Sequence, residues 1–264
     1  MSPLKISCKT MNAMNINKKT DRSSQNGMFP NIADPRGFTL VEVMVTLVIS
    51  SIVFAGIYTA FRSQQKSTDT QIQIAEAQQN LRAATLLMTR ELRMAGFDPT
   101  EDAGASIVNA TANSIHLTMD IRGNAGGPDK DGDGIPDPDG ATNDSDEDIT
   151  YSLYVDADGV SKLGRAAPAL NRPVAENIEA LQFFYTLADG TTTLAPADPD
   201  LIRSVKVSLV ARSDREDLNI VNNTTSFTMG SGAIWTPPNP NTNHFRYRFL
   251  TTTIECRNMG YKEL

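Results

Sequence analysis

The chain has 264 residues, a length that accommodates one sizeable domain with an extension or two small domains. Its 24 Lys and Arg residues against 31 Asp and Glu residues give a formal net charge of −7. This acidic balance argues against nucleic acid as a partner, because phosphate binding needs clustered cations. The charge is also unevenly distributed. Residues 1–37 carry six basic and two acidic side chains, a net charge of +4, so the remainder carries −11.

Residues 1–37 are polar and lack apolar periodicity, which predicts a disordered cytoplasmic leader, with either Met1 or Met28 as the true start. From Phe38 to Phe61 the only charged residue is Glu42. A helix of this length is about long enough to cross a ~30 Å hydrocarbon layer. Because Lys and Arg precede it, the positive-inside rule places the N-terminus in the cytoplasm and everything after Phe61 outside the inner membrane.

The rival interpretation of this segment is an ordinary secretory signal, with a small-residue cleavage site after Ala55. A secretory apolar region is only 7–15 residues long and would not carry an acid such as Glu42. An acidic side chain near the bilayer core costs roughly 2.5–3.5 kcal/mol, so it marks a functional site by default. The sequence therefore favours a retained membrane helix in which Glu42 has a partner.

The helical pattern continues beyond Arg62. Small and apolar residues recur at spacings of three and four, which indicates an amphipathic helix with one buried side: Ala77, Leu81, Ala84, Met88, Leu92 and Ala95. Gly96 and Pro99 then end it. The pattern predicts one helix of nearly 60 residues, although two helices separated near residues 67–69 would also fit.

The remainder is typical of strands. Residues 149–155 and 160–163 flank Asp156-Ala157-Asp158-Gly159, a strong hairpin signal. Further strands are expected at 114–119, along the alternating residues from Leu181 to Leu187 and from Val205 to Arg212, and from Phe245 toward Cys256. Residues 213–244 are rich in Pro, Asn and Thr and predict a long exposed loop, with room for a small hairpin. One long helix covering an antiparallel sheet is an α+β arrangement.

The segment from Gly37 to Glu42, with sequence Gly-Phe-Thr-Leu-Val-Glu, resembles the class III signal of type IV pilins and type II secretion pseudopilins. The resemblance implies that a membrane prepilin peptidase cuts between Gly37 and Phe38 and that Phe38 becomes the N-methylated first residue. It also identifies Glu42 as the acidic residue of the membrane helix. Pairing Glu42 with the terminal amine of a neighbouring subunit would offset the cost of two charges in lipid, and an intrachain pair with the Phe38 amine is the local alternative.

Within that family, residues 92–97, 175–181 and 205–212 resemble the PilW-type minor pilins, and the pseudopilin GspJ is built similarly. The resemblance covers most of residues 37–264 and implies a long N-terminal helix against an antiparallel sheet. The expected organisation is a leader over 1–37, a transmembrane half-helix over 38–61, an amphipathic half over 62–96 and a β-rich domain over 97–264. The implied partners are prepilin peptidase, other minor pilins, the major pilin and the inner-membrane assembly platform.

An acidic loop over residues 129–148 carries nine acids and one Lys. Its first part matches the calcium-loop pattern D-x-D-x-D-G, with Asp129, Asp131 and Asp133 at alternate positions. Ile135 is expected to offer its backbone carbonyl, and Asp137 to bind directly or through water. The pattern departs from an EF-hand, because position twelve is Gly140 and no helices flank the loop. Structural Ca²⁺ is therefore expected, against the alternative of a solvated acidic insertion.

A further ligand is expected from a later acid of the loop: Asp139, Asp144, Asp146 or Asp148. No catalytic motif is present, and His116, His244 and Trp235 are expected to be ordinary structural or surface residues. Without the leader Cys256 is alone, so we expect a buried small residue, with an intermolecular bridge as the alternative.

The sequence thus predicts a non-enzymatic minor pilin that helps to initiate a type IV pilus, at or near its tip. It would begin in the inner membrane with a periplasmic globular domain and end in the fibre at the cell surface. The alternatives are a GspJ-like type II secretion pseudopilin and a pilus-associated adhesin that uses the loop at 213–244.

Overall fold

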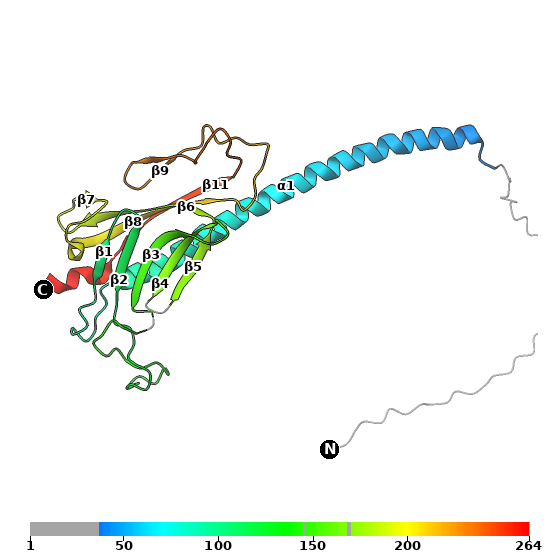
Figure 1. Ribbon diagram of the computed structural model, residues 1–264. Coiled ribbons are helices and arrows are strands. Elements are labelled where there is room, and N and C mark those ends of the chain that lie inside the picture. The colour runs from blue at the N-terminus through cyan, green and yellow to red at the C-terminus, as the bar shows by residue number, and fades with distance from the viewer. Residues whose placement is uncertain (1–36, 145, 168–169, 264) are drawn as a thin grey trace, which may run out of the picture. The chain divides into compact units, whose positions relative to one another are not determined.

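A computed structural model describes residues 37–144, 146–167 and 170–263 of the chain (Figure 1). The leader predicted over residues 1–37, including Met28, lies outside the described residues except for Gly37. By compactness the chain divides after Gly56.

Helix α1 (Leu40–Met94) is 55 residues long and shows no break at residues 67–69. From residue 77 onward its inward-facing side chains are buried, and all six positions of the predicted apolar stripe are among them: Ala77, Leu81, Ala84, Met88, Leu92 and Ala95. The helix ends at a left-handed glycine, Gly96, whose φ is +75°. The backbone N–H of Gly96 donates to the carbonyl of Thr118 at 3.0 Å, so the helix end is fixed to a strand end.

Eleven strands are present in the described residues, and their pairings are antiparallel. Five form a meander in sequence order: β1 (Ile107–Ala110), β2 (Ser114–Thr118), β3 (Asp148–Val155), β4 (Ser161–Ala167) and β5 (Leu170–Glu176). Four form a second sheet in the order β11 (Tyr247–Glu255), β8 (Ile202–Arg212), β6 (Ile178–Leu187) and β7 (Thr192–Thr193). A short hairpin joins β9 (Phe227–Thr228) to β10 (Ile234–Trp235). Short 3₁₀ helices lie at η1 (Pro199–Leu201) and η2 (Arg257–Glu263).

The structure therefore has two principal sheets where the sequence pattern indicated one. The chain changes sheets at Asn177, the single residue between β5 and β6, whose φ of +57° turns the backbone sharply. Asn is one of the few residues that adopt this left-handed conformation at low cost. The predicted α+β architecture is confirmed, because α1 packs on antiparallel sheets from residue 77 onward.

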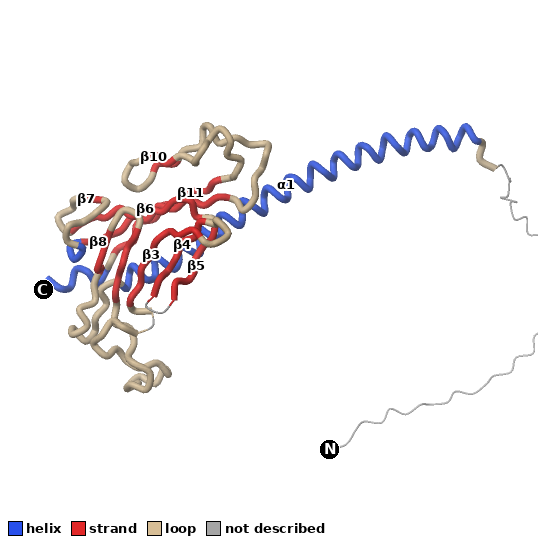
Figure 2. The backbone as a smooth tube through the Cα atoms, in the orientation of Figure 1, coloured by secondary structure: helices blue, strands red, loops and turns tan. Residues whose placement is uncertain are grey.

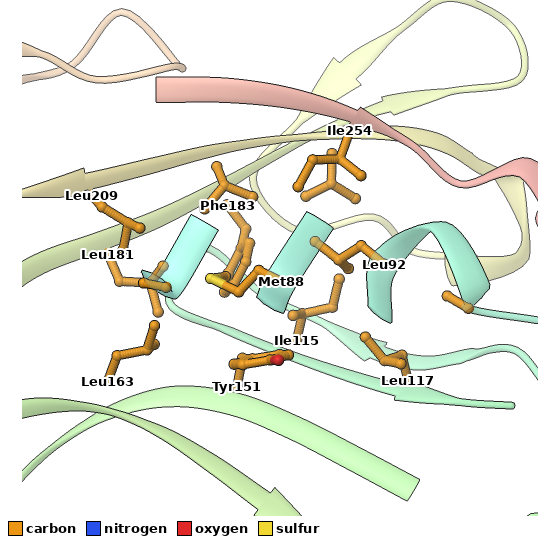
Figure 3. Close-up of a cluster of buried hydrophobic side chains, with 14 of the residues drawn as sticks. Met88, Leu92, Ile115, Leu117, Tyr151, Leu163, Leu181, Phe183, Leu209 and Ile254 are labelled. Atoms are coloured by element: carbon orange, nitrogen blue, oxygen red, sulfur yellow. The ribbon is translucent and has the colours of Figure 1, made fainter. Parts of the chain in front are cut away.

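Figure 3 shows how the second half of α1 fills the space between the sheets. Met88 and Leu92 point from the helix into side chains from both of them, and all are buried: Ile115, Leu117, Tyr151 and Leu163 from the first sheet, and Leu181, Phe183, Leu209 and Ile254 from the second. Burying a large apolar side chain contributes roughly 1.5–3 kcal/mol. The helix is thus the common core element of both sheets.

A buried polar group also ties α1 to the first sheet. Glu91, on the helix, accepts from the Tyr151 hydroxyl and from Arg165 Nε, which lies 2.9 and 3.1 Å from its two carboxylate oxygens. Arg165 Nη1 reaches Asp146 Oδ1 at 2.9 Å. Burial, and then the Glu91 charge, raise the pKa of Tyr151 far above its ordinary value, so the phenol remains a neutral donor.

The sequence predicted a long exposed loop over residues 213–244, with room for a small hairpin. The hairpin is present, but part of the loop is buried. Its β9–β10 hairpin lies over the four-stranded sheet (Figure 2) and places Phe227 and Trp235 on Phe249 and Tyr247. These rings form a second small cluster with buried Met229 and Val210. The loop folds back because strands β8 and β11 present apolar side chains on their outer face as well. Trp235 packs within this cluster, as expected of a lone tryptophan.

Cys256 is 3% exposed, in agreement with the prediction of a buried small residue. Burial raises the pKa of its thiol to about 12. A thiol so protected is unreactive at neutral pH, which disfavours the intermolecular disulfide.

Candidate processing, assembly and metal-binding sites

The two residues of the predicted cleavage site lie just before the helix and are accessible. Gly37 and Phe38 precede α1 in irregular backbone, and the Phe38 side chain is 82% exposed. A Cβ placed on Gly37 would meet no atom within 4 Å. Packing of this chain therefore does not require glycine at this position, and the reason for glycine lies outside the fold.

Thr39 directly precedes the first residue of α1 and caps its N-terminus. Its Oγ1 accepts a hydrogen bond from the Glu42 backbone N–H at 3.2 Å, and its carbonyl accepts from the Val43 N–H at 3.2 Å. Thr39 is the N-cap residue and Glu42 occupies the third helical position, the spacing of a T-x-x-E capping box. This cap was not recognised from the sequence, although its two residue types at that spacing are a local signal.

Glu42 is exposed and has no hydrogen bond or ion pair from its side chain within the described part of the chain. It lies in the first turn of α1, where the partial positive charge of the helix terminus favours a carboxylate. The apolar side chains near it in the sequence are exposed. The exposed fraction is 76% at Leu40 and 54% at Val53. A charged group on such a surface is available for a partner from another molecule.

Among the described residues, α1 is the one helix whose length and apolar composition suffice to cross a membrane. None of the side chains in its apolar stretch is buried within the structure. An exposed apolar surface of this extent belongs in lipid or against other protein chains.

The acidic loop brings three of its predicted ligands together. Asp129 accepts from the N–H groups of Gly132 at 2.7 Å and Gly134 at 3.0 Å, which curls the loop around its carboxylate. Both glycines have positive φ, +80° and +86°. In the curl, one carboxylate oxygen from each of Asp129, Asp131 and Asp133 lies within 4.8 Å of the others. Three carboxylates at this separation are the donor type and spacing that a hard cation such as Ca²⁺ takes.

The other predicted ligands are arranged differently. Asp137 accepts from the Lys130 N–H at 2.8 Å, and its own N–H donates to Pro128, so it closes the base of the loop. The Ile135 N–H donates to Asp133 Oδ1 at 2.8 Å. The later acids are engaged elsewhere, as follows: Asp139 with Asn124, Asp146 with Arg165, and Asp148 with His116 at 2.7 Å. Asp144 is not among the grouped carboxylates.

One buried acid was not singled out from the sequence. Glu147 is fully buried and accepts from the backbone N–H groups of Ile121, Arg122 and Asp144. Burial raises the pKa of its carboxyl, against the opposing effect of these hydrogen bonds. Glu147 thus links the end of the acidic loop to residues 121–122, which follow β2, and no sequence periodicity marks it.

Comparisons with known proteins give one family match at the N-terminal motif and another over the later part of the chain. The family described as the prokaryotic N-terminal methylation motif matches residues 33–58, and the family described as Type IV Pilus-assembly protein W matches residues 146–258. No curated protein matches the sequence significantly. Among solved structures, a type IV-like pilin from Thermus thermophilus is similar with 14% identity and a TM-score of 0.41, covering 69% of this chain and 97% of its own.

The two family matches occur in the order that the sequence motifs predict, with the prepilin motif at the start of α1 and the PilW domain from β3 onward. The second description names pilus assembly, which is a structural role. The motif implies processing by a peptidase and assembly with other pilins, and it fits a membrane-anchored chain. The chain therefore combines a prepilin methylation motif with a PilW-type domain, and it is similar to the type IV minor pilins of the PilW type.

Proposed function

We propose that prepilin peptidase cleaves the chain between Gly37 and Phe38, that Phe38 is then N-methylated, and that the processed protein helps to initiate a type IV pilus at or near its tip. The observation that carries this proposal is an accessible Gly37-Phe38 bond directly before a capped, exposed apolar helix. Gly37 has open space around it, so the protease is the natural reason for glycine there.

The topology follows from the charge of the leader. Basic residues precede the helix, so the N-terminus lies in the cytoplasm and the globular domain in the periplasm, until the protein enters the fibre. Its partners there are other minor pilins, the major pilin and the inner-membrane assembly platform.

Glu42 supplies the assembly contact in this proposal. Its carboxylate has no side-chain partner in the described residues, and cleavage creates a cationic amine on Phe38 of every subunit. Each isolated charge in lipid costs roughly 2.5–3.5 kcal/mol, and pairing Glu42 with the amine of a neighbouring subunit offsets both costs. The pair also fixes the axial register of adjacent helices.

Glu42→Leu is expected to be cleaved normally but to enter pili at least tenfold less, since even 1.4 kcal/mol of lost pairing energy corresponds to tenfold. Cleavage is measured by the mass of the chain, and incorporation by immunoblot of sheared pili against the membrane fraction. Glu42→Asp is the control that retains the charge. Normal incorporation of Glu42→Leu would contradict the pairing.

Gly37→Leu should instead leave a longer, uncut protein that keeps its fold, since the site has space for a side chain.

Deletion of the gene separates the alternatives. Loss of pili supports the assembly role, whereas intact pili with loss of secreted exoproteins identify a type II secretion pseudopilin. Pili that form but fail to adhere identify an adhesin, which would use the β9–β10 hairpin and its surrounding loop.

A second function, structural Ca²⁺ binding, is favoured by the three converging carboxylates of the acidic loop. Asp129, Asp131 and Asp133 would hold the ion, with Ile135 and Asp137 as the remaining candidates. The ion would neutralise part of the charge of the exposed loop and hold residues 129–137 in their curl.

At a Ca²⁺ concentration 100 times Kd, binding should stabilise the full chain in detergent by about 2.7 kcal/mol, a rise of roughly 5–10 °C in Tm. The double variant Asp129→Asn/Asp131→Asn should lose this rise, while Asp158→Asn, an exposed acid in the β3–β4 hairpin, should keep it. Calorimetric titration gives the binding heat directly. An unchanged Tm and no heat in the unaltered chain would exclude the site.

A further inference from the structure

Strand β11 is an open edge of the four-stranded sheet. Nine residues pair in unbroken register with β8, from Tyr247 to Glu255, without a proline or a bulge. The other sheet edges in the described residues are blunted: β1 has four residues and a register shift, β7 has two residues, and β5 carries Pro173 and a register shift. Natural sheets use such devices to prevent edge pairing, so an edge without them is a template for another strand.

The direction of the hydrogen bonds shows which residues offer this edge. Cys256 N donates to Arg203 O at 2.9 Å, and Ser213 N donates to Arg246 O at 2.7 Å, so the even-numbered residues between them bond inward to β8. The odd-numbered residues direct their N–H and C=O groups away from β8. Arg248 Nη1 covers the carbonyl of Tyr247 at 3.0 Å.

The open stretch therefore consists of four outward-directed residues, Phe249, Thr251, Thr253 and Glu255. Within the described chain no backbone group is recorded as bonded to them on this side. Four donors and four acceptors in a row, at strand spacing, specify one kind of ligand: an extended polypeptide.

A groove of about 520 Å³ runs between this edge and α1 and indicates the side chains of that ligand. Its apolar part is formed by Leu81, Leu86 and Leu250, and Leu86 is 73% exposed. Arg82 and Arg248 also line it, and neither forms an ion pair with a carboxylate in the part of the chain that the structure describes. The groove therefore fits a strand with apolar residues toward α1 and an acid near the two arginines.

We propose that β11 is a docking edge at which an extended segment of a different protein chain adds as a fifth strand. On the face of β11 toward α1 the side chains are Arg248, Leu250, Thr252 and Ile254, so the β11 strand of a second copy would supply no carboxylate to the two arginines. Charge complementarity thus favours a different chain over self-pairing. The identification of the partner chain as another pilus component rests on the proposed function. The proposal that β11 is a docking edge does not rest on it.

The test places a photo-crosslinking benzophenone amino acid at Glu255 of the full chain in cells, with the same label at Val155, an exposed position on β3, as control. The Glu255 label should form an adduct whose partner peptide alternates apolar and polar residues and carries an acid, and the Val155 label should not. Thr253→Pro, which removes one outward N–H, should lower the adduct yield about tenfold with the Tm of the chain unchanged, because that N–H has no partner in the fold. Thr253→Ser should leave the yield as it was.

An adduct to a second copy of this chain overturns the proposal, as does a yield at Glu255 no higher than at Val155 or a yield that Thr253→Pro leaves unchanged. Counting pili in deletion cells keeps the two proposals distinct. If deletion cells still form pili and the Glu255 label forms its adduct, the docking edge is supported and the assembly role is refuted. Loss of pili on deletion, without an adduct, would do the reverse.

Discussion

Replacing Glu91 with alanine is expected to lower the free energy of unfolding by about 3–5 kcal/mol. The substitution leaves the Arg165 guanidinium, whose side chain is 8% exposed, without its buried counter-ion, and it leaves the Tyr151 hydroxyl without its acceptor. Arg165 keeps Asp146, but that carboxylate is half exposed and screened by solvent. Because Glu91 lies on α1 and its partners lie on β3 and β4, the loss falls on the attachment of the helix to the first sheet.

The measurement is denaturant unfolding of the full chain in detergent. Glu76→Ala is the matched control, an exposed glutamate on the same helix, and should change stability by less than about 0.5 kcal/mol. The double variant Glu91→Met/Arg165→Met should recover most of the loss, because apolar residues of similar volume replace the buried pair. A loss in Glu91→Ala no larger than in Glu76→Ala would show that the pair contributes little.

The helix could be predicted residue by residue because its signal is local. Spacings of three and four put Ala77, Met88 and Leu92 on one face, and the structure buries all three. The Asp156–Gly159 turn was recognisable for the same reason, and the structure closes it with a bond from Asp156 N to Val160 O at 3.0 Å. Patterns formed by residues within a few positions of one another can be recognised without knowing which distant segments pack together.

Features that depend on distant contacts were not predictable. Glu91 finds its partners 60 and 74 residues away, and the sequence around it shows an ordinary charged helix position. The chain passes from the first sheet to the second at a single residue, Asn177, whose backbone is left-handed. Val210 lies on the outer face of β8, yet it is buried, because the β9–β10 hairpin covers that face of its sheet.

The candidate sites divide in the same way. The prepilin motif was recognisable because it is a linear segment, and the alternation of Asp129, Asp131 and Asp133 places the three acids together in the structure. Glu147 and the docking edge of β11 had no linear signal, since both depend on which strands become neighbours.

Phe183→Ala should reduce the free energy of unfolding by about 3–5 kcal/mol, the range for removing a fully buried aromatic ring. Phe183 is 0% exposed and projects from β6 toward Met88 of α1 (Figure 3). Its backbone N–H donates to Ala112 O at 2.8 Å, and the hydroxyl of its neighbour Tyr185 donates to Thr111 O at 2.7 Å. Both bonds reach the turn between β1 and β2, so Phe183 lies where the two sheets meet each other and the helix. A cavity at this position cannot close unless both sheets and α1 move.

Phe184→Ala provides the control, because it removes the same ring from the next position on the opposite, partly exposed face of β6. Its expected cost is about 1 kcal/mol. Denaturant unfolding followed by the signal of Trp235 reports on the second sheet, and far-ultraviolet circular dichroism reports on α1. If α1 is the common core of both sheets, the two signals must change together in Phe183→Ala. Separate transitions, or equal losses in the two variants, would mean that the sheets are stabilised independently of the helix.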